Sequence, residues 1–260
     1  YWAGWLRFDD LRNGAWVNTA FIYTRTLLGL GIFWGLAFPF YRRVSRGETP
    51  RARAGVLVLV YCLVFSLMGF DLVMALDPHW PSSLFGAYFF ISGMYIALAA
   101  WTLVSVLNRP SVQLIPLPDF AKLLVAFSLL TTYMMYSQLL PIWYENLPHE
   151  VRFVVPRLQA GSWPTLSAGL LAVIYLGPLV LLLPRKAKSS PAYMTIASVL
   201  ILVGMWCERW WLVAPTLGQP FQVRLVNLFA TAMFLGAFAF PVSLLNRRVP
   251  IVRMRKIDGE

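Results

Sequence analysis

Three ionisable residues stand inside long apolar runs of this 260-residue chain: Arg25, Asp71 and Glu208. A charged side chain in the hydrocarbon of a membrane is costly and is therefore usually paired or functional. With a helical rise of about 1.5 Å per residue, Arg25 falls near the middle of its run, and the two acids fall in one common half. The three could meet there. They would form either an ion pair that only fixes helix packing, or part of a proton relay or the wall of a quinone pocket.

A second candidate site is the sequence DPHWP, residues 77–81, six residues after Asp71. An Asp-Pro pair commonly starts a turn, and the prolines end the preceding helix. His79 titrates near neutral pH and could pass protons between a buried site and water. Asp71, His79 and Trp80 are also the candidate contacts for a quinone. The alternative interpretation is a plain turn.

The run 120–144 carries more hydroxyl and amide groups than a lipid-facing helix needs. Such groups often hydrogen bond neighbouring helices to one another, but they can also hold the waters of a proton path. Asp119 is expected to be the N-cap of this helix or the mouth of such a path, and Glu145 marks the opposite end. The candidates for a proton pathway are Arg25, Asp71, Asp77, His79, Asp119, Tyr133, Tyr136, Glu145 and Glu208.

The composition places these residues in a membrane protein. Hydrophobic residues make up 59% of the chain and charged residues only 13%, about half the share of a soluble domain. The apolar runs are continuous and long enough to span a bilayer, and they do not alternate as barrel strands would. The sequence therefore predicts an all-α polytopic membrane protein.

The sequence lacks the motifs of several other kinds of functional site. The chain has no glycine-rich phosphate loop, no CxxC pair and no nucleophile elbow, and we expect no metal site. Its two histidines fall outside the expected spans, which argues against a transmembrane haem with two histidine ligands. The net charge of +11 is attributed to membrane topology and anionic lipids, with no nucleic-acid partner expected.

We expect seven transmembrane helices in a single integral membrane domain, residues 1–260. They cover residues 16–41, 54–76, 83–107, 120–144, 164–183, 192–213 and 223–245. Fifteen of the 22 Lys and Arg residues fall on one side of these spans and six on the other. By the positive-inside rule the C-terminus is cytoplasmic and Tyr1 lies outside. A first residue that is not Met and lies outside predicts further helices upstream.

Three segments resemble one family of membrane subunits. The segments FDLVMALDPHWPSSLFGAYFF, SQLLPIWYENLPHE and WLVAP are similar to the polysulfide-reductase-type (NrfD-like) integral membrane subunits of alternative complex III. That complex is a bacterial quinol:cytochrome c oxidoreductase with two such subunits, and the chain looks most like the second of them. The resemblance covers residues 16–250. The chain departs from the family pattern at PHE, residues 148–150, and with Glu in place of Asp at position 208.

The resemblance implies a ten-helix fold built around two four-helix bundles, with the first three helices absent here. It implies a bacterial inner-membrane location and a proton-conducting role, with quinol such as menaquinol oxidised chiefly in a sister NrfD-like subunit. This chain would bind no redox cofactor. Haem c and iron–sulfur clusters would belong to periplasmic partner subunits, and a terminal oxidase is a further partner. By residue match, the implied functional residues are Asp71, Asp77, His79, Glu145 and Glu208.

Two alternatives stay open. The chain could be a non-catalytic scaffold that anchors peripheral subunits. It could also be the quinone-binding membrane anchor of a related molybdenum-type or polysulfide-type reductase, because one fold serves several functions. A transporter or a retinal-binding sensor is disfavoured. The sequence shows no broken helices in an inverted repeat, and Lys122 lies at the start of a span while the other lysines lie outside the spans.

Overall fold

The computed structural model describes residues 18–77, 80, 82–107, 116–222 and 224–248, and the backbone alone for Thr19, His149 and 238–248. Within these ranges every regular element is a helix. The helices are α2 (Thr19–Val44), α3 (Arg51–Leu72), the short η2 (Met74–Leu76), α4 (Phe85–Leu107), α6 (Leu117–Glu145), α7 (Pro148–Gln159), α8 (Trp163–Leu170), η3 (Leu171–Leu176), α9 (Gly177–Leu182), α10 (Arg185–Lys188), α11 (Pro191–Val213) and α12 (Leu225–Arg248).

Six of these helical stretches are long and apolar enough to cross a membrane, which confirms the prediction of an all-α, multi-pass membrane protein. They correspond to the first six expected spans, with ends shifted by a few residues. The seventh expected span, 223–245, falls on α12, which is helical to Arg248. Side chains are described only as far as Ala237, and up to that residue they form an apolar helix, Leu225–Ala237.

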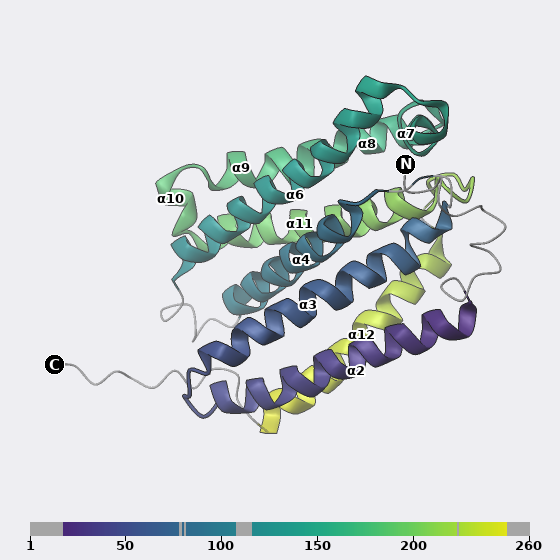
Figure 1. Cartoon of the computed structure of the whole chain (residues 1–260). Coiled ribbons are helices and arrows are strands. Elements are labelled where there is room, and N and C mark those ends of the chain that lie inside the picture. Colours follow the sequence, from purple (N-terminus) through teal and green to yellow (C-terminus); the bar gives the residue numbers. More distant parts are fainter. Residues whose placement is uncertain (1–17, 78–79, 81, 108–115, 223, 249–260) are drawn as a thin grey trace.

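The spans form a four-helix bundle with two helices added on one side (Figure 1). Helix α4 packs against both α6 and α11, and the continuous stretch α8–η3–α9 packs against the same two helices. On its other side α4 packs against α3, which packs against α2. Helix α12 is tied to α11 by a hydrogen bond from Trp206 Nε1 to Thr231 Oγ1 of 3.1 Å. We call the two ends of the assembly the α7 end and the α10 end.

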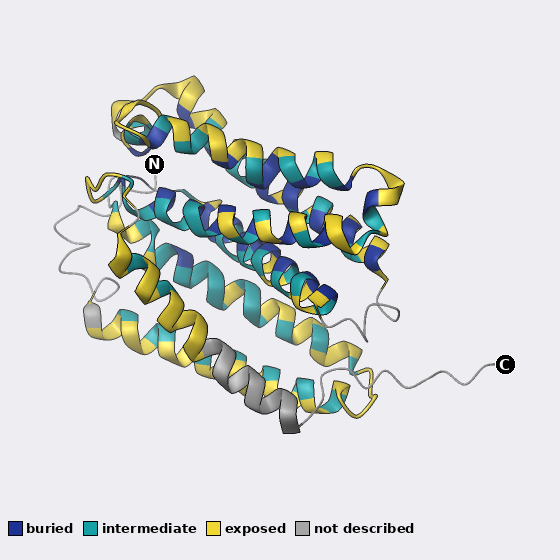
Figure 2. Cartoon of the chain, turned by 180° about the vertical axis from the view of Figure 1, so that it is seen from behind, coloured by how far each residue is buried: buried dark blue, intermediate teal, exposed yellow. Residues whose placement is uncertain are grey.

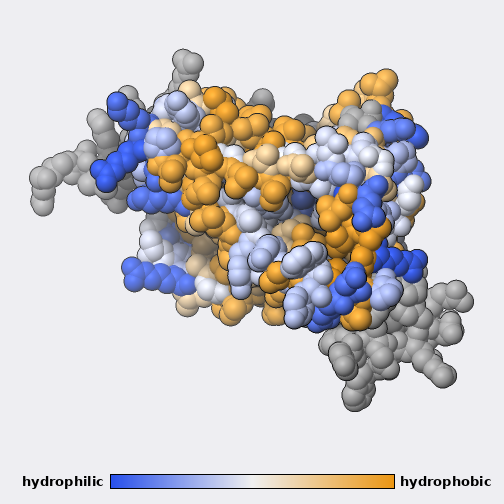
Figure 3. All heavy atoms as spheres, turned by 90° about the horizontal axis from the view of Figure 1, so that it is seen from above, coloured by the Kyte–Doolittle hydropathy of each residue, from blue (hydrophilic) through white to orange (hydrophobic). Residues whose placement is uncertain are grey.

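The buried side chains gather in the four-helix bundle, whereas α2 and the described part of α12 carry none (Figure 2). The outer surface is also apolar: Leu27, Leu63 and Val180 are each about two-thirds exposed. In Figure 3, apolar side chains cover the middle of the visible face and polar ones lie toward its ends. Helices that are apolar on all sides are expected where lipid replaces water.

Glycines set the closest helix contacts. A Cβ on Gly69 of α3 would lie 2.7 Å from Cβ of Phe89 on α4, and a Cβ on Gly86 of α4 would lie 2.7 Å from Cζ of Phe70 on α3. A Cβ on Gly204 of α11 would lie 2.6 Å from Cγ1 of Ile174 in η3. Small residues let membrane helices approach closely and gain packing contacts. Gly204 therefore determines how near α11 comes to η3.

The structure departs from the sequence prediction in the fifth span. The expected continuous helix 164–183 is instead α8, a π-helical turn (η3) and α9. Pro178 has no N–H to donate to the carbonyl oxygen four residues earlier, that of Ile174. Tyr95 on α4 and Ser128 on α6 lie within hydrogen-bond distance of that oxygen, at 3.1 and 3.3 Å. The side chains of neighbouring helices thus stabilise the irregular turn.

Two smaller corrections concern the ends of α6. The helix begins at Leu117, so Asp119 lies in its first turn and is not the expected N-cap. The N-cap is Pro116, which has no side-chain capping bond. Beyond the other end of α6, the stretch between the expected spans 120–144 and 164–183 contains the amphipathic helix α7.

Candidate functional site

Arg25 and Asp71 form an ion pair between α2 and α3. The guanidinium donates two hydrogen bonds to the carboxylate, from Nε to Oδ2 (3.0 Å) and from Nη2 to Oδ1 (2.5 Å). The side chains are 13% and 5% exposed. The two hydrogen bonds use both carboxylate oxygens, which is the strong geometry for such a pair. This contact has the form of the packing ion pair considered from the sequence.

Glu208 lies in a different cluster. It is 1% exposed and accepts a hydrogen bond at Oε1 from the hydroxyl of Tyr88 on α4. The Tyr88 hydroxyl lies 3.5 Å from that of Tyr175, which comes from η3. Arg25 and Asp71 are bonded to each other and not to Glu208. Of the three charged residues proposed to meet, two are joined and the third has other partners.

The nearest cation to Glu208 is its neighbour in sequence, Arg209. Nη1 of Arg209 lies 3.6 Å from Oε2 of Glu208, which is beyond hydrogen-bond length, and among the described residues Oε2 has no hydrogen-bond partner. Nη2 donates to Ser92 on α4 at 2.6 Å, and the guanidinium lies 4.7 Å from the ring centre of Phe89. Glu208 and Arg209 thus lie close together without a hydrogen bond between them.

Three helices position the Glu208 cluster. On α4, Tyr88, Ser92 and Tyr95 follow one another at spacings of four and three, which places them on one helical face, and all three are buried. On α11, Gly204 precedes Glu208 by one turn and permits the close approach to η3. The missing side chain at Gly204 therefore lets α11 lie close to η3, one turn from Glu208.

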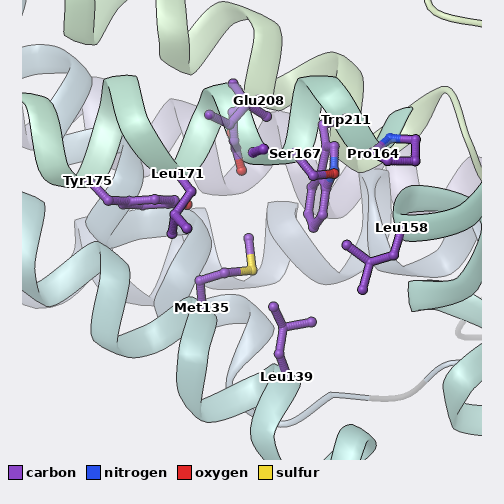
Figure 4. Close-up of a pocket in the computed structure, with 11 residues that line it drawn as sticks. Met135, Leu139, Leu158, Pro164, Ser167, Leu171, Tyr175, Glu208 and Trp211 are labelled. Carbon is purple, nitrogen blue, oxygen red and sulfur yellow. The ribbon is translucent and has the colours of Figure 1, made fainter. Parts of the chain in front are cut away.

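A pocket of about 330 Å³ adjoins Glu208 between α6, α7, α8, η3 and α11 (Figure 4). Its polar lining residues include Glu208, Tyr175 and Ser167. Ser167 is already engaged, because its hydroxyl accepts from Trp211 Nε1 at 2.7 Å and lies 2.8 Å from the carbonyl oxygen of Arg157. In Figure 4 the carboxylate end of Glu208 is directed into the space between Tyr175 and Trp211. Most of the remaining wall is apolar.

A buried cation holds the α7 end together. Arg157 of α7 is 1% exposed and donates to the carbonyl oxygens of Trp211 (3.0 Å), Leu212 (2.7 Å) and Phe153. These bonds satisfy carbonyls at the C-terminus of α11, which have no partner within the helix. Burial lowers the pKa of Arg157 to about 9, and the charge of Asp77 acts in the opposite direction. Arg157 therefore remains a cation at neutral pH.

The DPHWP turn reaches the same end of the bundle. Trp80 is 3% exposed and stacks on Phe153, with ring centres 3.5 Å apart and planes 6° from parallel. The Trp80 N–H donates to the carbonyl oxygen of Asp77 at 3.1 Å, which closes a turn. His79 lies outside the described residues. In the described part of the turn, Trp80 anchors it to α7.

The other candidates from the sequence lie at the surface. Tyr133 and Tyr136 are 61% and 58% exposed on the outer face of α6. Glu145 is exposed at the end of that helix. Asp119 forms an exposed ion pair of 2.8 Å with Lys122. None of these four belongs to the Glu208 cluster.

The sequence analysis missed Tyr88, Tyr175, Arg209 and Arg157. The spacing of polar residues along α4 is the signal that could have indicated the first, because it predicts a polar stripe on one face. Arg209 was assigned to membrane topology, yet its position beside a buried acid was visible. Nothing local marks Arg157, since its carbonyl partners in α11 lie more than 50 residues away.

The arrangement offers acid–base chemistry inside a membrane domain. A carboxylate, two phenols and a pocket lie together, and carboxylates and hydroxyls of this kind can exchange protons along hydrogen bonds. The two phenol oxygens are 3.5 Å apart, at the long limit of a hydrogen bond, and either hydroxyl could be the donor. No protein-family model matches the chain, and a search of curated proteins found no match.

Proposed function

We propose that this chain is a membrane subunit of a bacterial quinol:cytochrome c oxidoreductase of the alternative complex III type, in which it provides part of a proton pathway and anchors partner subunits. The similarity of its three sequence segments to that family supports the assignment. The structural observation that carries it is the buried Glu208, bonded to Tyr88 and left with one oxygen unbonded among the described residues. A carboxyl group kept in this state within a membrane domain is suited to take up and release a proton.

The proposed pathway uses the Glu208 cluster and excludes the Arg25–Asp71 pair. Glu208 would exchange its proton with Tyr88, and Tyr88 with Tyr175. Both oxygens of Asp71 accept hydrogen bonds from Arg25, so this side chain already joins α3 to α2. Asp71 is therefore assigned a role in packing.

We place the chain in the bacterial inner membrane with its α10 end in the cytoplasm. Basic residues at that end support this orientation: Arg42, Arg43, Arg46, Arg51, Arg53, Lys122, Arg185, Lys186 and Lys188. The same residues would contact anionic lipids. The sister membrane subunit, the periplasmic iron–sulfur and cytochrome c subunits, and a terminal oxidase are the partners that the resemblance implies.

The test is the substitution Glu208→Gln in the purified complex. Quinol:cytochrome c turnover and proton release are measured in liposomes, after assembly has been checked. We expect turnover to persist and the number of protons released per electron to fall. Glu48→Gln is the matched control, because it makes the same change at an exposed position outside the pathway candidates and should alter neither quantity.

An unchanged proton yield in the Glu208→Gln complex would refute the proton pathway. The chain would then be interpreted as a scaffold. The broad apolar exterior of α2 and α3 favours this second function, since it offers a surface for another membrane helix as well as for lipid.

A further inference from the structure

Helix α7 lies across one end of the membrane bundle. It runs from Pro148 to Gln159 and connects two spans, which end at Glu145 and begin at Trp163. In Figure 1 it is seen nearly end-on, whereas α6 and α8 run across the page. A helix that crosses the ends of membrane spans lies along the membrane surface and not through the bilayer. Its sides therefore face the bundle, the hydrocarbon and the water.

One face of α7 is packed against the bundle. Phe153 and Arg157 lie one turn apart on this face and are 4% and 1% exposed. Phe153 stacks on Trp80, and Arg157 donates hydrogen bonds to carbonyl oxygens at the end of α11. These contacts fix the rotation of α7 about its axis, so its other side chains have defined directions.

A second side of α7, which we call the apolar edge, consists of Val151, Val155 and Leu158. Their spacings of four and three place them together, and Val155 and Leu158 are 37% and 54% exposed. Leu158 also lines the pocket of about 330 Å³, whose other walls come from α6, α8, η3 and α11 (Figure 4). Since those walls belong to the spans, the apolar edge is directed toward the membrane interior.

A third side of α7 is polar, and aromatic residues mark the level of the helix. Arg152 is exposed and lies six residues from Leu158, which is about 120° around the helix. Trp143 and Tyr144, in the last turn of α6, are 77% and 83% exposed. Such rings gather where hydrocarbon meets lipid headgroups. An arginine on the water side of that level is suited to a lipid phosphate.

From this arrangement we infer that α7 is an interfacial helix and that its partner is a phospholipid. One acyl chain lies along the apolar edge and enters the pocket, and the headgroup phosphate lies on the side of Arg152. Lipid is favoured over a protein partner because the apolar edge continues the lipid-facing surface of the spans through the exposed Leu158 and Leu171. The inference goes beyond the proposed function, since it assigns this end of the chain no proton transfer.

The test uses the purified protein, with its native partner chains, in nanodiscs of phosphatidylglycerol and phosphatidylcholine. Two photoreactive phosphatidylglycerols are added in parallel, one with a diazirine within an acyl chain and one with a diazirine on the headgroup. Mass spectrometry then locates the adducts. We expect the chain probe to label Leu158 and the pocket residues Met135 and Leu139, and the headgroup probe to label the segment around Arg152.

Leu158→Asn and Leu176→Asn are a matched pair of variants. The two leucines are 54% and 51% exposed, but Leu158 lines the pocket and Leu176 lies in η3 outside its lining. Loss of the apolar contact in Leu158→Asn should lower labelling of Met135 and Leu139 by the chain probe roughly tenfold. Leu176→Asn should leave that labelling unchanged. Thermal unfolding of both variants shows whether either has lost its fold.

The labelling of the unaltered protein decides the inference even where a variant is unstable. Absence of the chain probe's label from Leu158 and from the pocket would overturn it, because a partner chain would then cover the apolar edge. Equal labelling of Leu158 and Arg152 by both probes would also overturn it, since α7 would have no fixed orientation at the interface. The proton yield of the Glu208→Gln complex is measured separately, so failure of one proposal does not decide the other.

Discussion

Two ion pairs with a buried carboxyl group differ in how completely their charged atoms are hydrogen bonded. Arg25 and Asp71 come from different helices and share two hydrogen bonds that use both carboxylate oxygens. Glu208 and Arg209 are neighbours on one helix, and their charged atoms stay 3.6 Å apart. Adjacent residues on a helix point in different directions, so Glu208 turns toward Tyr88 while Arg209 turns toward Ser92.

Under the proposed function, this difference separates a packing role from a chemical one. In the first pair both carboxylate oxygens of Asp71 accept hydrogen bonds from Arg25, and the pair joins α2 to α3. In Glu208 one oxygen accepts from a phenol and the other has no hydrogen-bond partner among the described residues, and our proposal assigns proton exchange to this group. Depth in the membrane, which is all that the sequence supplied, does not distinguish these cases.

The largest expected effect on stability comes from removing one partner of the Arg25–Asp71 pair. Replacing Asp71 by Leu leaves the Arg25 guanidinium buried without its anion, and should lower the free energy of unfolding by about 4 kcal/mol. Thermal unfolding in detergent measures this. The double variant Arg25→Met/Asp71→Leu should recover most of the loss, since apolar packing replaces the pair. A double variant as unstable as Asp71→Leu would mean that the pair does more than fix packing.

A smaller loss is expected where α11 approaches η3. Gly204→Ala places a Cβ 2.6 Å from Cγ1 of Ile174, which is fully buried and cannot move aside. We expect destabilisation of about 2 kcal/mol and displacement of Glu208 from Tyr175. Adding Ile174→Ala removes the clashing atom and should restore part of the stability. If Ile174→Ala restored no stability, Gly204 would not be the residue that sets the distance between α11 and η3.

Next comes the phenol that bonds Glu208. Tyr88→Phe removes only the hydroxyl and leaves Oε1 of Glu208 without its donor, at a cost of about 1.5 kcal/mol. Tyr95→Phe is the control on the same buried face. It should cost less, because Ser128 remains within 3.3 Å of the carbonyl oxygen that Tyr95 bonds. Equal losses in the two variants would argue against a special role for Tyr88.

The smallest effect is expected at the surface pair of α6. Asp119 and Lys122 are both more than half exposed, so Asp119→Asn should change the free energy of unfolding by less than about 0.5 kcal/mol. Proton release by the complex should also stay unchanged. A marked fall in proton release would make Asp119 part of a proton pathway, which is one of the two roles considered from the sequence. Proton transfer would then not be confined to the Glu208 cluster.

The spans were predictable because apolar length is a local property: six of the expected seven match helices to within a few residues. The irregular fifth span was not predicted. Pro178 was visible, but the donors that stabilise the π turn come from Tyr95 and Ser128 on two other helices. The helix α7 was missed because it lies along a stretch of mixed polarity between two spans, where no apolar run marks it.

The sequence by itself determined that this is an all-α membrane protein and that Arg25, Asp71 and Glu208 lie inside its apolar runs, since long uncharged stretches make the few charges within them visible. Only the tertiary structure decided which of these residues meet. That decision rests on close helix contacts at Gly69, Gly86 and Gly204 and on the rotation of α4 and α11 about their axes. A helix can satisfy its own backbone whatever its neighbours, but its side chains find partners only when packing fixes which face meets which.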